Sequence, residues 1–217
     1  MQPNTQTTQL KDIQQITRNF VTLQGLVNLP IGFLLLFNGF NLLHRGSSEG
    51  SNLTGWAASL SEASRFASHE LGLVLIFLVI ALFFAIRFYY RNRFGVIKPL
   101  EADEREMKLT GIGFGILFLL TAVIDLSAQV PIPLIGLVFA AAWGVRAWRV
   151  PFHRAAYVAF SLASLITTFI GSTIGFADHE ARFGFVMMLN GMQLAAAGLL
   201  DHSLLLKYFK TVGLNRE

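Results

Sequence analysis

Six long stretches without a charged residue divide this chain of 217 residues. A helix rises about 1.5 Å per residue, so roughly 20 apolar residues cross a hydrocarbon core of about 30 Å. The stretches reach or approach that length, and they are continuously apolar, whereas the strands of a membrane barrel alternate. The chain is 53% hydrophobic and only 14% charged, which is too apolar for a soluble domain. The sequence therefore predicts an all-α, polytopic membrane protein, a bundle of six transmembrane helices.

The stretches divide the chain into a lead-in, a transmembrane domain and a tail. We expect the six helices of the domain, which spans 20–206, at 20–43, 66–90, 107–126, 131–148, 153–175 and 183–206. The lead-in, 1–19, has apolar residues at near-helical spacing and is expected to lie on the inner membrane surface. Residues 207–217 form the tail. Pro131 and Pro133 predict a short turn between the third and fourth helices, because proline interrupts a helix.

Basic residues are distributed unevenly between the two sides of the predicted bundle. If the chain begins in the cytoplasm, all but three of the 17 Lys and Arg residues lie on that side, the exceptions being Arg45, Arg65 and Arg182. Cytoplasmic loops of membrane proteins carry this excess. We therefore expect a multi-pass protein of the cell membrane with both termini in the cytoplasm. Contact of these residues with anionic headgroups of the bilayer explains the pI near 9.7 without nucleic-acid binding.

Two adjoining segments lie on the expected cytoplasmic side. The first, RFYYRNRFG at 87–95, is typical of an interface anchor, with aromatic rings at headgroup level and arginines near phosphates. The second, 98–108, contains a proline followed by acidic residues, which favour the start of a helix. We interpret 98–108 as a solvated extension of the third helix. The alternative is a docking surface for a cytosolic partner.

Polar residues form a stripe on each of two helices. Those of the first helix are Gln24, Asn28 and Asn38. Those of the sixth are Asn190, Gln193, Asp201 and His202. Because the two helices run in opposite directions, the stripes are expected to face each other, as hydrogen-bonded contacts or as a polar path or pocket. A carboxylate near a helix C-terminus opposes the dipole, so Asp201 requires a compensating group. The candidates are Arg146, Lys207, His202 and a bound cation.

Two near-identical pentapeptides, FASHE at 66–70 and FADHE at 176–180, occur at the expected outer ends of the second and sixth helices. Their imidazoles and carboxylates, with one further acid, could bind zinc or another divalent cation. These candidate ligands are His69, Glu70, Asp125, His179 and Glu180. Adjacent His and Glu side chains diverge by about 100° on a helix, so the two helices would have to converge. The simpler interpretation is two helix starts capped by Ser68 and Asp178, and no cofactor is predicted.

Small residues at helical spacing favour close helix packing, either within the bundle or between copies in a homo-oligomer. Such residues include Gly111 and Gly115 in the third helix and Gly136, Ala140 and Gly144 in the fourth. There is no phosphate-binding loop, zinc-protease motif or nucleophile elbow, and no cysteine for thiolate chemistry. We favour a transport-type or accessory membrane protein with a polar path or pocket between the first and sixth helices. The alternatives are an intramembrane metal-dependent enzyme and a structural or sensory scaffold.

Overall fold

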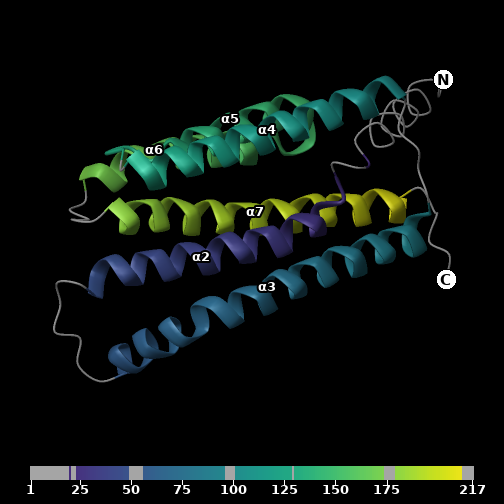
Figure 1. The fold of residues 1–217 in the computed structure, drawn as a ribbon. Coiled ribbons are helices and arrows are strands. Elements are labelled where there is room, and N and C mark those ends of the chain that lie inside the picture. Colours follow the sequence, from purple (N-terminus) through teal and green to yellow (C-terminus); the bar gives the residue numbers. More distant parts are fainter. Residues whose placement is uncertain are drawn as a thin grey trace, which may run out of the picture.

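The computed structural model of the chain describes residues 20, 23–48, 56–95, 101–128, 130–173 and 179–211. These residues form helices and short connections, with no strand among them, which confirms the predicted all-helical bundle (Figure 1). In chain order the elements are the 3₁₀ turn η1 (Gly25–Val27), α2 (Asn28–Ser48), α3 (Trp56–Phe94), α4 (Glu101–Ala128), α5 (Leu134–Arg149), the 3₁₀ turn η2 (Pro151–His153), α6 (Arg154–Thr173) and α7 (His179–Thr211).

Five helices in the described part of the chain are long and apolar enough to cross a membrane. Their candidate spans are Gly25–Leu43, Val74–Phe94, Lys108–Ala128, Pro151–Ile170 and His179–Lys210. The remaining long helix, α5, has 16 residues, which corresponds to about 24 Å. Backbone groups in lipid must find partners within their own segment, which is why apolar stretches of this length fold as helices.

Proline and glycine set several of the helix boundaries. Pro30 lies in the first turn of α2, where a backbone N–H would have no intrahelical partner. Pro133 precedes α5 and Pro151 follows it, so α5 fits between two prolines. Gly95, with φ of 76°, follows α3 in the left-handed conformation that commonly ends a helix. The two prolines that flank α5 account for the short turns between α4, α5 and α6.

Some boundaries differ from those expected. Gln24 precedes η1 and lies outside a regular helix. The second helix begins at Trp56, so Ser68 lies inside α3 and the predicted cap at Ser68 is wrong. The start of α7 is His179, and Asp178 lies outside the described residues. By contrast, α4 begins at Glu101, which confirms the predicted extension of the third helix.

The antiparallel helices α2 and α7 form the closest contact of the bundle, and glycines make it possible. A Cβ atom built on Gly39 would lie 2.5 Å from the carbonyl oxygen of Gly184, and one on Gly191 would lie 2.6 Å from that of Gly32. Gly25 and Gly198 approach each other in the same way. These three glycine pairs let the two backbones touch, as small residues do in membrane bundles.

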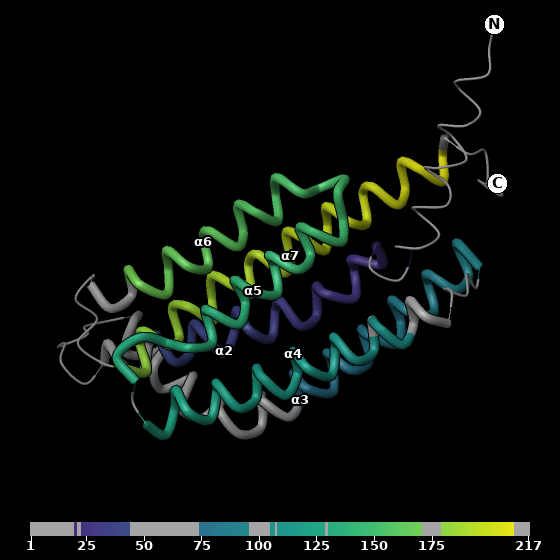
Figure 2. Tube along the Cα trace, turned by 90° about the horizontal axis from the view of Figure 1, so that it is seen from above, coloured from purple at the N-terminus to yellow at the C-terminus, as the bar shows by residue number. Residues whose placement is uncertain are grey.

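The other helices surround this pair. The antiparallel pair α5 and α6 packs against α7, while α3 packs against α2 and α4 packs against α5 (Figures 1 and 2). Outward-facing apolar side chains cover α3 and α4, for example Phe77, 70% exposed, and Leu119, 65% exposed. Gly111 and Gly115 of α4 face open space in the described structure. Such surfaces suit contact with lipid or another membrane helix.

Candidate functional site

Asp201 of α7 has no exposed surface and is held by side chains from two other helices. Arg146 of α5 donates from Nη2 to one carboxylate oxygen, and the hydroxyl of Tyr157 in α6 donates to the other. The Arg146 guanidinium also lies 5.3 Å from the centre of the Tyr157 ring, a cation–π distance. Of the compensating groups expected for Asp201, the structure therefore selects Arg146.

The positions of the three residues follow from the turn between α5 and α6. Arg146 lies one turn before the end of α5, and Tyr157 lies one turn after the start of α6. The short turn, which contains Pro151, brings both side chains to one level of α7. On another side, a Cβ atom built on Gly25 would lie 2.6 Å from the Asp201 Cβ, so only glycine fits there. Four segments thus converge on one carboxylate.

Aromatic rings enclose the Arg146–Asp201–Tyr157 cluster. The Trp143 ring stacks on Tyr157 with centroids 5.9 Å apart and planes inclined by 7°. The His153 ring meets the edge of Tyr157 at 6.4 Å. Among the described side chains, the buried atoms Trp143 Nε1 and His153 Nε2 have no hydrogen-bond partner. Buried polar atoms usually have a partner, so these two atoms distinguish the surroundings of the ion pair from an apolar core.

Next to Asp201 in α7, His202 faces α3. Its Nδ1 lies 2.9 Å from the Tyr90 hydroxyl, which also accepts a hydrogen bond from the Leu26 backbone N–H at 3.2 Å. Tyr90 is 1% exposed, so its assignment to an interface anchor with the rest of 87–95 is wrong. The adjacent Tyr89 is exposed, in agreement with that assignment. Tyr90 instead ties α3 to η1 and α7.

A second set of polar groups continues along the contact between α6 and α7. Ser164 Oγ lies 2.7 Å from Asn190 Oδ1 and 2.9 Å from Gln193 Oε1. Thr168 donates to the Ser164 carbonyl at 2.6 Å, and Ser164, Thr168 and Asn190 are each 0% exposed. We call Asp201, Gln193, Asn190, Ser164 and Thr168 the polar seam. It follows α6 and α7 away from Arg146.

The two sequence-predicted stripes therefore do not meet as expected. Asn190 and Gln193 contact α6, whereas glycine-to-glycine contact fills the space between α2 and α7. Asn38 is exposed and its Nδ2 donates to the Leu34 carbonyl within α2. Asn28 approaches α7, since a Cβ atom on Gly198 would lie 3.5 Å from the Asn28 Cβ. The α7 stripe was placed on the correct helix, but its partners come from α5 and α6.

At the opposite end, Asp125 is a cap for α5. Its two carboxylate oxygens accept hydrogen bonds from the backbone N–H groups of Leu134 at 2.8 Å and Ile135 at 2.9 Å. Pro133, which precedes α5, provides no side-chain cap, so α4 supplies it. Asp125 lies in the last turn of α4, where a carboxylate opposes the helix dipole, and its hydrogen-bond partners belong to the next helix.

The metal-site candidates are only partly described. His179 donates from Nε2 to the Asp125 backbone carbonyl, and Glu180 is exposed. No three His, Asp or Glu side chains among those described are grouped to hold a metal ion. The side chains of His69 and Glu70 in α3 lie outside the described part.

In the 98–108 segment, the first residues lie outside the described part and the rest belong to α4. Glu106 accepts a hydrogen bond from Arg149 of α5 at 2.5 Å, and Arg149 also donates to Thr110 at 3.0 Å. Glu106 is 59% exposed, so this ion pair contributes little stability. It joins α4 to α5 at the end of the bundle where Arg146 lies.

The sequence reasoning missed Tyr157 and Ser164. Tyr157 stands in an uncharged stretch, where a buried hydroxyl needs a partner, and it lies one helix turn beyond Arg154. Ser164 resembles the many small residues of α6, so nothing in the sequence alone separates it from a packing residue. Both become identifiable only when α6 is placed against α7.

Comparison of the chain with protein-family models, curated proteins and solved structures gave no significant match. The fold and the site thus define its class on their own: an all-helical bundle of membrane-spanning type that encloses a buried ion pair.

Proposed function

We propose that the chain is a multi-pass protein of the cell membrane that transports a small anion together with a proton, or is the membrane subunit of such a transporter. The observation that carries this proposal is the buried carboxylate of Asp201 paired with Arg146. Ionisable groups inside membrane helices are expensive, and they commonly mark the pathways of ions and protons. An apolar pair would hold the helices together at lower cost.

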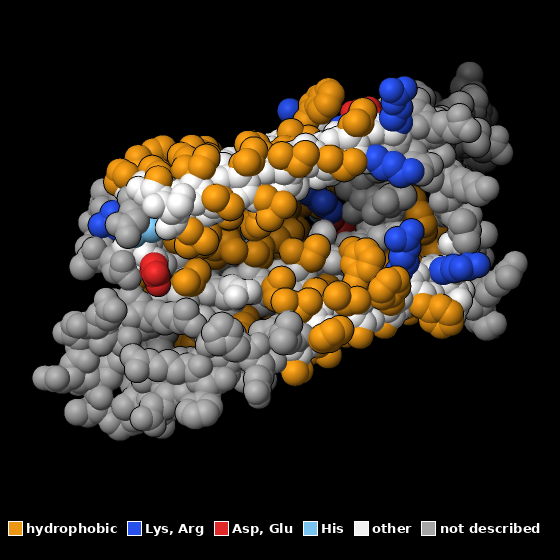
Figure 3. Space-filling view, viewed as in Figure 1, with side chains coloured by type: hydrophobic (Ala, Val, Ile, Leu, Met, Phe, Trp, Pro, Cys, Tyr) orange, Lys and Arg blue, Asp and Glu red, His pale blue; other side chains and the backbone are white. Residues whose placement is uncertain are grey.

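The two partners differ in their access to the surroundings. The Asp201 side chain is 0% exposed, whereas that of Arg146 is 21% exposed. Figure 3 shows a hollow in this face of the molecule, with charged side chains of both signs inside it. Protonation of Asp201 would remove its charge and leave the Arg146 guanidinium to bind an anion through its forked N–H donors. One proton and one monovalent anion would then be bound together without net charge.

The polar seam supplies a direction for movement. Its hydroxyl and amide groups lie on α6 and α7 about two helix turns from Asp201, and side-chain hydrogen bonds join Ser164 to Asn190 and Gln193. The contact between α2 and α7 is instead made by backbones and leaves no room for change. We therefore place the moving contact between α6 and α7, with α2 and α7 as the fixed part.

The same proposal places the end of α7 in the cytoplasm. Figure 3 shows that most Lys and Arg side chains of this face gather toward that end. The chain has no cysteine, so single substitutions can report sidedness. In intact cells, a thiol reagent that does not cross membranes should label Glu180→Cys but not Lys210→Cys. Labelling of Lys210→Cys alone would reverse the orientation, and equal labelling of both would contradict the membrane assignment.

Transport can be tested in liposomes that contain the purified full chain and a pH-sensitive dye. We expect gradients of small carboxylates or inorganic phosphate to drive proton uptake with at least one anion. The variant Asp201→Asn with Arg146→Gln should abolish this uptake, because it removes both charges while it keeps the shapes and hydrogen-bonding groups.

A matched control is Arg149→Gln with Glu106→Gln, which removes an exposed ion pair one turn away. This control should keep the uptake of the natural chain. Proton uptake no greater than that of protein-free liposomes with every anion would contradict the proposal. So would full uptake by the neutral Asp201 and Arg146 variant, which would leave the ion pair as a structural tie in a scaffold.

A further inference from the structure

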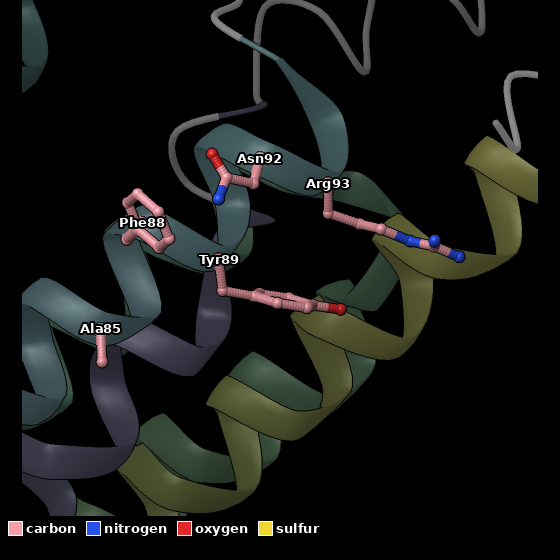
Figure 4. Close-up of a pocket in the computed structure, with 5 residues that line it drawn as sticks. All are labelled: Ala85, Phe88, Tyr89, Asn92 and Arg93. Carbon is pink, nitrogen blue, oxygen red and sulfur yellow. The ribbon is translucent and has the colours of Figure 1, made fainter. Parts of the chain in front are cut away.

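A shallow pocket of about 370 Å³ lies on the last turns of α3, outside the Arg146–Asp201–Tyr157 cluster. It is lined by Ala85, Phe88, Tyr89, Asn92 and Arg93. Figure 4 shows Tyr89 and Arg93 extending from α3 toward α7. The Tyr89 ring lies 6.0 Å from that of His202, so one side of the pocket adjoins the contact between α3 and α7.

The chemistry of the pocket changes along the helix axis. Ala85 and Phe88, on the side of the membrane interior, are apolar, whereas Asn92 and Arg93, near the helix end, are a hydrogen-bonding group and a cation. Tyr89, between them, has an apolar ring and a polar hydroxyl. From Ala85 to Arg93 the helix rises about 12 Å. A phospholipid has the same order, from acyl chain through glycerol to phosphate.

Charge and surface character also fit a phospholipid. Arg91 and Arg93 both lie in the last turn of α3, and no carboxylate in the described part of the chain pairs with either one. Beyond the pocket toward the membrane interior, α3 exposes a continuous apolar surface that includes Phe84, 65% exposed, and Phe77, 70% exposed. Acyl chains can lie along this surface while the basic residues attract a phosphate.

We propose that this pocket is a binding site for an anionic phospholipid of the leaflet at this end of the bundle. The Arg93 guanidinium and Asn92 amide bind the phosphate, the Tyr89 hydroxyl lies near the glycerol, and Phe88 and Ala85 contact the first acyl carbons. A lipid there also covers Tyr89 where its ring meets His202 of α7. It thereby stabilises the association of α3, which otherwise packs mainly on α2.

The site can be tested by thermal unfolding of the purified full chain in neutral detergent, with added phosphatidylglycerol or phosphatidylcholine. We expect phosphatidylglycerol to raise the unfolding temperature and phosphatidylcholine to have a much smaller effect. Arg93→Gln should weaken the apparent affinity about fivefold, the expected loss for one basic residue at a membrane surface. Ala85→Trp, which fills the pocket without a change of charge, should also weaken it. Arg87→Gln is the matched control, because Arg87 is exposed on α3 outside the pocket.

Three outcomes would overturn the lipid site. Equal stabilisation by both lipids would remove the requirement for negative charge, and an equal loss in Arg87→Gln would indicate diffuse attraction to basic residues. Stabilisation by glycerol 3-phosphate as large as that by phosphatidylglycerol would assign the site to a free phosphate compound. The neutral Asp201 and Arg146 variant should keep its lipid response, so failure of the transport proposal would leave this result unchanged.

Discussion

Replacement of Gly39 by alanine should destabilise the bundle by about 1–3 kcal/mol, although alanine is the better helix former by about 1 kcal/mol. The added methyl group would lie 2.5 Å from two backbone atoms of α7, the Gly184 carbonyl oxygen and the Met188 nitrogen. Neither atom belongs to a flexible side chain, so α2 and α7 must move apart. Separation of the two helices would weaken contacts along both of them.

Gly113→Ala is the matched control for this substitution. Gly113 lies within α4, and a Cβ atom built there has no described neighbour within 4 Å. Alanine at this position should therefore leave stability unchanged or raise it by up to about 1 kcal/mol. Thermal unfolding of both variants in the same detergent compares them directly. Equal effects of the two substitutions would show that α2 and α7 are not in backbone contact.

The helices were predictable from the sequence, because bilayer thickness fixes how long an apolar stretch must be. The sequence analysis expected α2 to face α7 through polar stripes, but the glycine contact that joins the two helices was not predicted, although its signal is present. Gly25, Gly32 and Gly39 are seven residues apart, as are Gly184, Gly191 and Gly198. A step of seven falls only about 20° short of two turns, so each set lines one face. Steps of four along the chain lead to Gly136 instead, which lies against the side chains of Thr168 and Val186 on the neighbouring helices.

Part of the Arg146–Asp201–Tyr157 cluster was also predictable, from the cost of a charge inside the membrane. A carboxylate within an apolar helix requires a partner, so Asp201 could be named from chemistry alone, with Arg146 as one of four candidate compensating groups. The sequence alone could not show which helix contacts the polar residues of α7, such as Asn190. Asn28 of α2 is as suitable a hydrogen-bonding partner as Ser164 or Tyr157 of α6. Asp125 shows the same limitation. Its carboxylate opposes the dipole of its own helix, α4, and only the position of α5 shows that it caps the N-terminus of that helix.

Arg146→Gln should destabilise the protein by about 3–5 kcal/mol, and Asp201→Asn by less. The reason is the unequal exposure of the two side chains. Without Arg146, the Asp201 carboxylate remains 0% exposed, with only the Tyr157 hydroxyl to stabilise it. Arg146 is 21% exposed in the natural structure and lies one turn from the helix end. If Asp201 loses its charge, the long Arg146 side chain can therefore turn toward headgroups and water.

The double substitution, Asp201→Asn with Arg146→Gln, should recover most of the loss, to within about 1 kcal/mol of the natural chain, because no unpaired charge then stays buried. The quantity to determine is the coupling free energy from a double-mutant cycle of unfolding in detergent. Strictly additive effects would mean that the two side chains do not interact. A larger loss for Asp201→Asn than for Arg146→Gln would place the exposed member of the pair on α7, and the exposed side of Arg146 could then not be where an anion binds.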